Sequence, residues 1–202
     1  MKKIYIFCSV IIAIIIVLCA LSIMLQDYKM SKDIIVIKAE ENLIIGIDKG
    51  DTRCSVYDVM TDRVQIDDAI VRTKFKNLHI LSSTINLAGI DIEFMEKSNN
   101  DSSFSKGSQL KTRLDKIKDQ FDYVIMDCPP SLGLITTNAL TASDSVIIPV
   151  QCEFFALEGI MQLLNTIMMA QKTLNPNLDI EGVLLTMLDS RTNLGFEVVD
   201  DI

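Results

Sequence analysis

A carboxylate that follows a short run of apolar residues is the sharpest chemical signal in this sequence. Asp127 ends the run Tyr-Val-Ile-Met-Asp over residues 123–127, and the turn-forming residues Pro129, Pro130 and Gly133 follow it. Such a run is typical of a strand buried in a parallel sheet, and ligands of open α/β sheets bind at the carboxyl ends of these strands. Asp127 is therefore a candidate Mg²⁺ ligand, the alternative being an apolar strand that ends in a solvated acid.

Polar residues follow a second apolar run in the same way. Residues 145–150 form this run, and Gln151 and Glu153 come directly after it. The carboxyl ends of parallel strands meet at one edge of a sheet, so we expect Gln151 and Glu153 to border the crevice that holds Asp127. The alternative for both residues is a place on the rim without a chemical role.

Strand-like and helix-like segments alternate along the rest of the chain. The predicted strands cover residues 34–37, 43–47, 78–81, 123–127, 145–150 and 183–187. The predicted helices cover residues 55–60, 66–71, 86–97, 110–120, 134–142 and 155–175. Continuous apolar strands separated by helices predict an α/β fold, in which flanking helices cover a parallel sheet.

Composition limits the classes of protein to which the chain can belong. Its 202 residues suffice for one domain, and its formal net charge is −8. Residues 1–30 contain three lysines and one aspartate, a net charge of +2, so residues 31–202 have a net charge of −10. A body this acidic argues against a broad nucleic-acid-binding surface. The five cysteines form no CxxC pair and there is one histidine, which disfavours a disulfide framework or a zinc site and indicates a reducing compartment.

Residues 4–25 contain no charged side chain. As a helix they would reach about 33 Å, enough to cross a bilayer, and they are longer than the apolar region of a signal peptide. The sequence therefore predicts a single-pass membrane protein, divided into a membrane segment with its hinge over residues 1–30 and a body over residues 31–202. Lysines flank both ends of the apolar segment, so charge does not decide the orientation, and the cysteines favour a cytoplasmic body.

Three longer motifs lie in the second half of the chain. They are DCPPSLG over residues 127–133, NALTASDSVIIPVQCE over residues 138–153 and IEGVLLTMLDSRTNLG over residues 180–195. Together with GIDKG over residues 46–50, they resemble the ParA/Soj family of chromosome-partitioning ATPases. The resemblance implies a MinD-like, deviant-Walker P-loop NTPase fold that binds ATP and Mg²⁺. It also implies an ATP-dependent homodimer and a ParB/Spo0J-like partner that stimulates hydrolysis.

The resemblance also implies roles for single residues. Asp127 matches the Walker B acid, which helps to hold Mg²⁺ beside the nucleotide, and Pro130, Gln151 and Glu153 match the border of the nucleotide site. Arg191 matches a basic position that contributes to DNA contact in the family. For Arg191 the alternative is a solvated arginine in a loop.

The sequence departs from the family pattern at both ends. No Gly-Lys-Thr or Gly-Lys-Ser occurs, and the order is reversed in Lys106-Gly107-Ser108, which lies in a polar segment without a preceding strand. The family's C-terminal strand and loop, which help to enclose the adenine, would lie beyond Ile202. The sequence therefore predicts an incomplete P-loop NTPase-like domain without the Walker A region and the C-terminal end.

Two alignments of the N-terminal part remain open. Residues 34–37 match either the family's first strand, with the phosphate loop deleted between about residues 37 and 43, or its second strand. The second strand ends in Asp-x-Asp-Pro in the family, whereas residues 37–42 contain no proline and have Lys38 at an acid position. In either alignment the phosphate loop is missing.

Three functions follow from these features. The first is a ParA/Soj-like partitioning ATPase homologue in which ATP binding is impaired. The second is a non-catalytic interaction module tethered to a membrane, and the third is the product of a truncated or rearranged gene. Nucleotide binding separates the first function from the other two.

Overall fold

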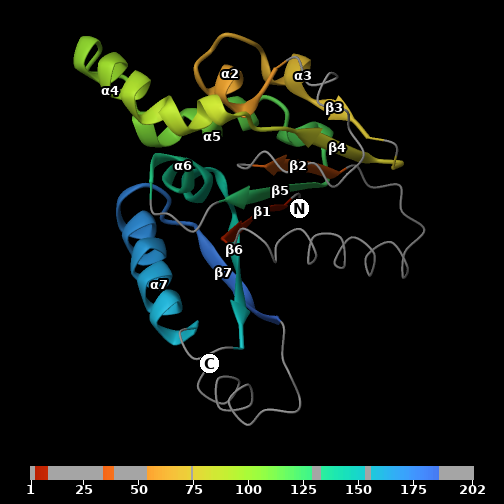
Figure 1. The fold of residues 1–202 in the computed structure, drawn as a ribbon, viewed down its shortest axis with the longest axis vertical. Coiled ribbons are helices and arrows are strands. Elements are labelled where there is room, and N and C mark those ends of the chain that lie inside the picture. Colours follow the sequence, from red (N-terminus) through yellow and green to blue (C-terminus); the bar gives the residue numbers. More distant parts are fainter. Residues whose placement is uncertain are drawn as a thin grey trace.

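In the computed structural model, the described part of the chain consists of residues 3–8, 34–38, 54–73, 75–128, 133–152 and 156–186. These residues form one seven-stranded sheet with the order β3-β4-β2-β5-β1-β6-β7, and helices pack beside it (Figure 1). Neighbouring strands run parallel except for β3, which pairs antiparallel with β4 at one edge. The α/β fold with a mainly parallel sheet agrees with the prediction from the sequence.

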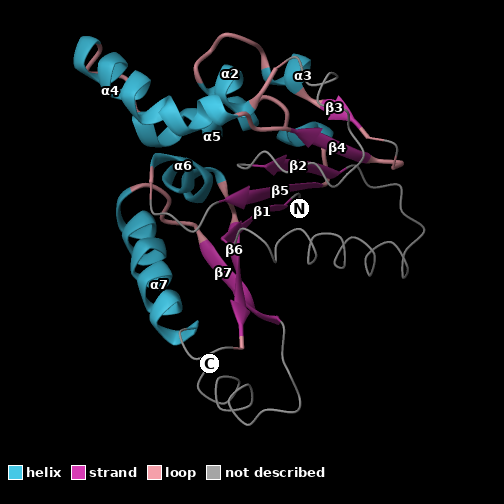
Figure 2. Ribbon diagram, in the orientation of Figure 1, coloured by secondary structure: helices cyan, strands magenta, loops and turns pink. Residues whose placement is uncertain are grey.

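The strands are the magenta arrows of Figure 2. Their bounds are β1 (Lys3–Cys8), β2 (Ile34–Lys38), β3 (Val71–Arg72), β4 (Leu78–Leu81), β5 (Tyr123–Cys128), β6 (Ser145–Gln151) and β7 (Asp179–Thr186). The helices are α2 (Val56–Met60), α3 (Ile66–Ala69), α4 (Ile90–Asn100), α5 (Gln109–Leu114), α6 (Leu134–Ala142) and α7 (Ala156–Thr173). Short 3-10 helices are η1 (Ile85–Gly89), η2 (Lys106–Ser108) and η3 (Lys118–Gln120).

The first strand of the chain lies inside the sheet, between β5 and β6. Lys3 of β1 is opposite Tyr123 of β5, and Tyr5 is opposite Ser145 of β6. The expected membrane-spanning helix over residues 4–25 is therefore wrong for residues 4–8, which are strand. An uncharged apolar run suits a buried central strand as well as a spanning helix, and the partner strands on both sides decide the outcome.

No helix within the described residues is long and apolar enough to cross a membrane. The remainder of the predicted span, residues 9–25, lies outside the described residues, so membrane attachment stays a prediction. The predicted division between residues 30 and 31 separates β1 from the two strands with which it pairs.

The core includes both faces of the central strands. In β2 the consecutive residues Ile35, Val36 and Ile37 are all buried. Successive side chains of a strand point to opposite faces, so both faces of β2 are covered. The buried cluster continues into the helices, where Phe94 of α4 and Leu114 of α5 are almost completely inaccessible.

Two buried asparagines join the helices to the loops beside them. Asn138 of α6 accepts a hydrogen bond from the Leu110 N–H at 3.1 Å and donates to the carbonyls of Lys106 and Leu134 at 2.8 and 3.0 Å. Asn175 donates to two carbonyls at the end of α6, at 2.7 and 3.0 Å. The bonds from Asn138 to Leu110 and Lys106, and those from Asn175, connect backbone groups of different segments, and they fix α6 against its neighbours.

Candidate functional site

The order of the strands marks one position in the sheet as a ligand site. In the sheet, β5 lies on one side of β1 and β6 on the other. The chain goes from β1 to β2, which lies beyond β5, and later from β5 to β6, on the opposite side of β1. The topology thus changes direction around β1. Ligands of open α/β sheets bind in the crevice at such a point, outside the carboxyl ends of the strands.

Asp127 lies at this crevice. It is the penultimate residue of β5 and is only 7% exposed. The backbone register places it between Phe7 of β1 and Lys38 of β2. The structure therefore confirms that Asp127 stands near the carboxyl end of a buried parallel strand, and it adds that a lysine occupies the adjacent position of the neighbouring strand.

The place of β2 decides between the two alignments left open by the sequence. β1 holds the position of a first strand beside β5, and β2 follows it on the other side of β5. Residues 34–38 therefore correspond to a second strand. A phosphate-binding loop would follow β1, and residues 9–33, which come next in the chain, lie outside the described residues.

A small cavity lies beside Asp127. Its volume is about 20 Å³, room for about one water molecule. Apart from Asp127 and Cys128, its lining is apolar and comes from β2, α2, η1, α5, β5 and α6. The cavity can admit water to a buried carboxylate but is far too small for a nucleotide.

Of the other predicted site residues, Gln151 is the last residue of β6. β1 separates β6 from β5, and the register aligns both Asp127 and Ile147 with Phe7. Gln151 is therefore four residues further along the strand direction than Asp127, or about 13 Å. The two residues lie at the same edge of the sheet but are staggered. Pro130, Glu153 and Arg191 lie outside the described residues.

The described residues fit a magnesium nucleotide only in part. Asp127 has the oxygen chemistry that Mg²⁺ prefers, but no group of three His, Cys, Asp or Glu side chains gathers in the described part of the chain. Lys106 and Gly107 belong to η2, where a side chain in place of Gly107 would meet Thr137 and Leu174. Among the described residues we therefore find one candidate metal ligand and no cradle for phosphates.

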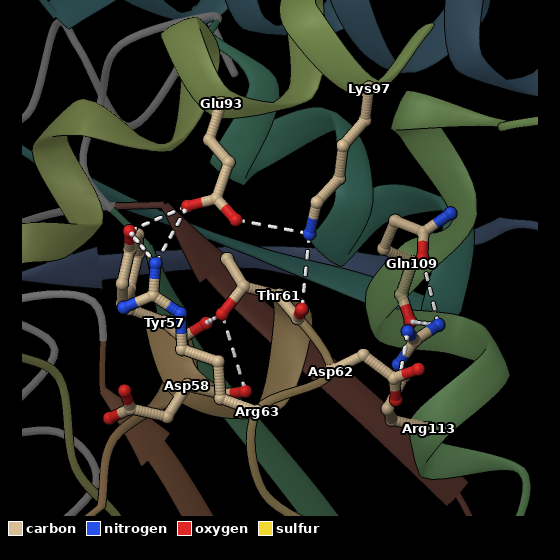
Figure 3. A network of polar contacts seen from close by, with 9 residues as sticks. All are labelled: Tyr57, Asp58, Thr61, Asp62, Arg63, Glu93, Lys97, Gln109 and Arg113. Carbon is tan, nitrogen blue, oxygen red and sulfur yellow. Dashed lines mark hydrogen bonds and ion pairs between the residues drawn. The ribbon is translucent and has the colours of Figure 1, made fainter. Parts of the chain in front are cut away.

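A second polar cluster, which the sequence did not indicate, joins α2 to α4 (Figure 3). The Tyr57 hydroxyl donates to Glu93 at 2.6 Å, Arg63 lies 3.4 Å from the same carboxylate oxygen, and Lys97 lies 3.0 Å from the other. The hydrogen bond from Tyr57, with help from Lys97, lowers the pKa of Glu93, and the same bond raises the pKa of Tyr57. No local pattern could predict this cluster, because it joins residues 36 positions apart.

Comparison with known protein sequences shows the family of this chain. The sequence profile of the AAA domain family matches residues 16–180. The sporulation initiation inhibitor protein Soj of Bacillus subtilis is 52% identical over 158 residues, which are 78% of this chain and 60% of Soj. The chromosome partitioning protein ParA of Myxococcus xanthus is 39% identical over 158 residues, which are 78% of this chain and 54% of ParA. The chain thus spans less than two thirds of the length of these relatives.

Solved structures extend the similarity to the whole chain. Cobyrinic acid a,c-diamide synthase from Mycobacterium smegmatis superposes with a TM-score of 0.85 at 30% identity, covering 100% of this chain and 80% of the synthase. Another structure of that synthase contains a bound ATP analogue and magnesium. A plasmid partition protein from Borrelia burgdorferi gives a TM-score of 0.75 at 23% identity over 99% of this chain and 84% of its own, a likeness of fold.

Proposed function

Because this chain belongs to the AAA-domain family of ParA/Soj-like partitioning ATPases, we propose that it is a partitioning ATPase homologue with an incomplete nucleotide site. Its P-loop NTPase-like sheet retains the acid-bearing strand β5. One observation carries the proposal: the segment that follows β1, where a phosphate loop belongs, contains no glycine, and the first glycine of the chain is Gly46.

Phosphate binding depends on that missing loop. Glycines allow successive backbone N–H groups to turn toward the phosphates, and a lysine adds charge on the β- and γ-phosphates. Residues 9–33 provide lysines but no glycine. Asp127 can contribute to Mg²⁺ binding but cannot hold a triphosphate by itself, so we infer that ATP binds weakly.

The remaining features of the family are extended to this chain as proposals. ATP with Mg²⁺ is the ligand class, in line with the bound ATP analogue and magnesium of the synthase structure. Pro130, Gln151 and Glu153 border the site, and Arg191 contacts DNA. A homodimer and a ParB-like partner complete the proposal.

A titration of the full chain with a fluorescent ATP analogue and Mg²⁺ tests the proposal. We expect no saturation below about 1 mM, and the same weak signal from Asp127→Ala. Asp122→Ala is the matched control, because Asp122 is an acid just before the other end of β5. Micromolar affinity that Asp127→Ala abolishes and Asp122→Ala preserves would contradict the proposal.

A further inference from the structure

Helix α4 has apolar side chains on two opposite faces. Ile90 and Phe94 are buried on the inner face, where the Phe94 ring meets Phe104 edge-on with centroids 5.2 Å apart. Ile92 and Met95 are 68% and 59% exposed. At about 100° per residue these two side chains project away from the buried pair and lie next to each other as an i, i+3 pair. The inner face accounts for the folding of α4, and the outer pair does not contribute to it.

Acidic side chains flank the outer pair. Around the helix the order is Asp91, Met95, Ile92, Glu96, and both acids are exposed. We call these four residues the outer stripe. The helix dipole accounts for an acid in the first turn, such as Asp91, but not for Glu96 in the second.

The polar cluster between α2 and α4 fixes the direction of the outer stripe. Glu93 and Lys97 point from α4 toward α2, where Glu93 meets Tyr57 and Lys97 donates to the Thr61 carbonyl at 3.1 Å (Figure 3). These contacts hold the inner face of α4 against α2, while one end of α4 projects beyond the other helices (Figure 1). The stripe is thus presented on a rigid element, which lowers the entropic cost of binding.

We propose that the outer stripe of α4 is a docking surface for a protein segment that is both apolar and basic. Exposed apolar side chains at the centre of a surface supply binding free energy when a partner covers them. The acids on either side select a partner with lysine or arginine around its apolar side chains, and they speed its association. None of its four residues lines the cavity beside Asp127, and the inference does not depend on ATP binding.

A synthetic amphipathic helix of about 15 residues, with leucine on one face and lysine on the other, is the probe. Its binding to the full chain is measured by fluorescence anisotropy. We expect Ile92→Ser with Met95→Ser to weaken binding by about tenfold or more, and Asp91→Asn with Glu96→Asn to weaken it and reduce its dependence on salt. Met161→Ser with Met169→Ser is the matched control, because these α7 side chains are 60% and 67% exposed. The control should bind like the unmodified chain.

Several results would overturn the proposal. Equal binding by all variants, or no binding at all, would show that the stripe does not recognise such a segment. Equal binding of a peptide with glutamate in place of lysine would remove the role of the acids. If sedimentation velocity shows self-association, and if the substitutions in the outer stripe abolish it, the stripe binds a second copy of the chain instead of a basic segment. Circular dichroism verifies that each variant is folded, as expected for substitutions at exposed positions.

Discussion

Lys38, the last residue of β2, stands directly opposite Asp127 in the ladder between β2 and β5. Neighbouring strands are about 4.8 Å apart, so the backbone register puts a lysine position beside the position of the acid that would hold a metal ion. We expect a lysine at this register position to compete with a divalent ion for the same carboxylate, since both are attracted by its negative charge.

Replacement of Lys38 tests this competition. We expect Lys38→Asp to increase the affinity of the full chain for Mn²⁺ by about tenfold, because it removes a positive charge and adds a carboxylate beside Asp127. Lys38→Ala, which only removes the charge, should give a smaller increase. Electron paramagnetic resonance of free Mn²⁺ measures both. Unchanged affinity in both variants would show that Lys38 and Asp127 do not share a site.

The pKa of Glu93 makes stability depend on pH. Since folding lowers this pKa, the carboxylate stabilises the protein above its ordinary pKa of 4.5, and the contribution is lost as the pH falls through the lower folded value. We expect Glu93→Gln to reduce the free energy of unfolding by about 1 kcal/mol at pH 7, and by less at pH 3.5. Urea unfolding at both pH values measures the difference.

Glu96→Gln is the control for this experiment, because Glu96 is an exposed acid on the same helix. It should change stability little at either pH. An equal loss in Glu93→Gln at pH 7 and pH 3.5 would mean that ionisation of Glu93 does not stabilise the fold.

Asn138 should be essential for stability. Its side chain is fully buried, and it satisfies the Leu110 N–H and the carbonyls of Lys106 and Leu134. Asn138→Ala would leave the Leu110 N–H and the Lys106 carbonyl without their side-chain partner, at a cost of about 2–3 kcal/mol. Thermal unfolding should show a decrease in Tm of roughly 5–10 °C. The exposed Asn177→Ala is the control, and an equally small effect from both variants would contradict the role of Asn138.

Deletion of residues 1–30 should prevent cooperative folding. The deletion removes β1, and with it the strand pairing that joins β5 to β6 at the centre of the sheet. We expect the shortened chain to bind the dye ANS and to unfold without a sharp transition, in contrast to the full chain. A cooperative transition at the Tm of the full chain would show that β1 is dispensable.

The sequence predicted several elements of the fold with bounds close to those observed. The helix over residues 134–142 and the strand over residues 78–81 have the predicted bounds, and β6 extends one residue further. In these segments the apolar periodicity agrees with the packing, and turn-forming residues mark their ends. For the candidate site the sequence identified Asp127, because a buried strand that ends in an acid is a local pattern.

The errors concern features that depend on distant partners. The apolar sequence of residues 4–8 is compatible with a helix and with a strand. Only its pairing with β5 and β6 decides between them. The proximity of Lys38 to Asp127 depends on the register of two strands far apart in the sequence. One further error is local. The helix predicted over residues 86–97 is instead η1 followed by α4, and η1 has the tighter winding of a 3-10 helix.

The central place of β1 also determines when the protein can fold during its synthesis. Lys3 leaves the ribosome 120 residues before its partner Tyr123, and the strand on its other side begins only at Ser145. Translation adds about 5–20 residues per second, so the apolar N-terminal segment waits for several seconds without its neighbours. A sheet whose central strands pair with residues far away in the sequence folds slowly. The nascent chain is therefore a natural client for chaperones that bind apolar segments as they emerge.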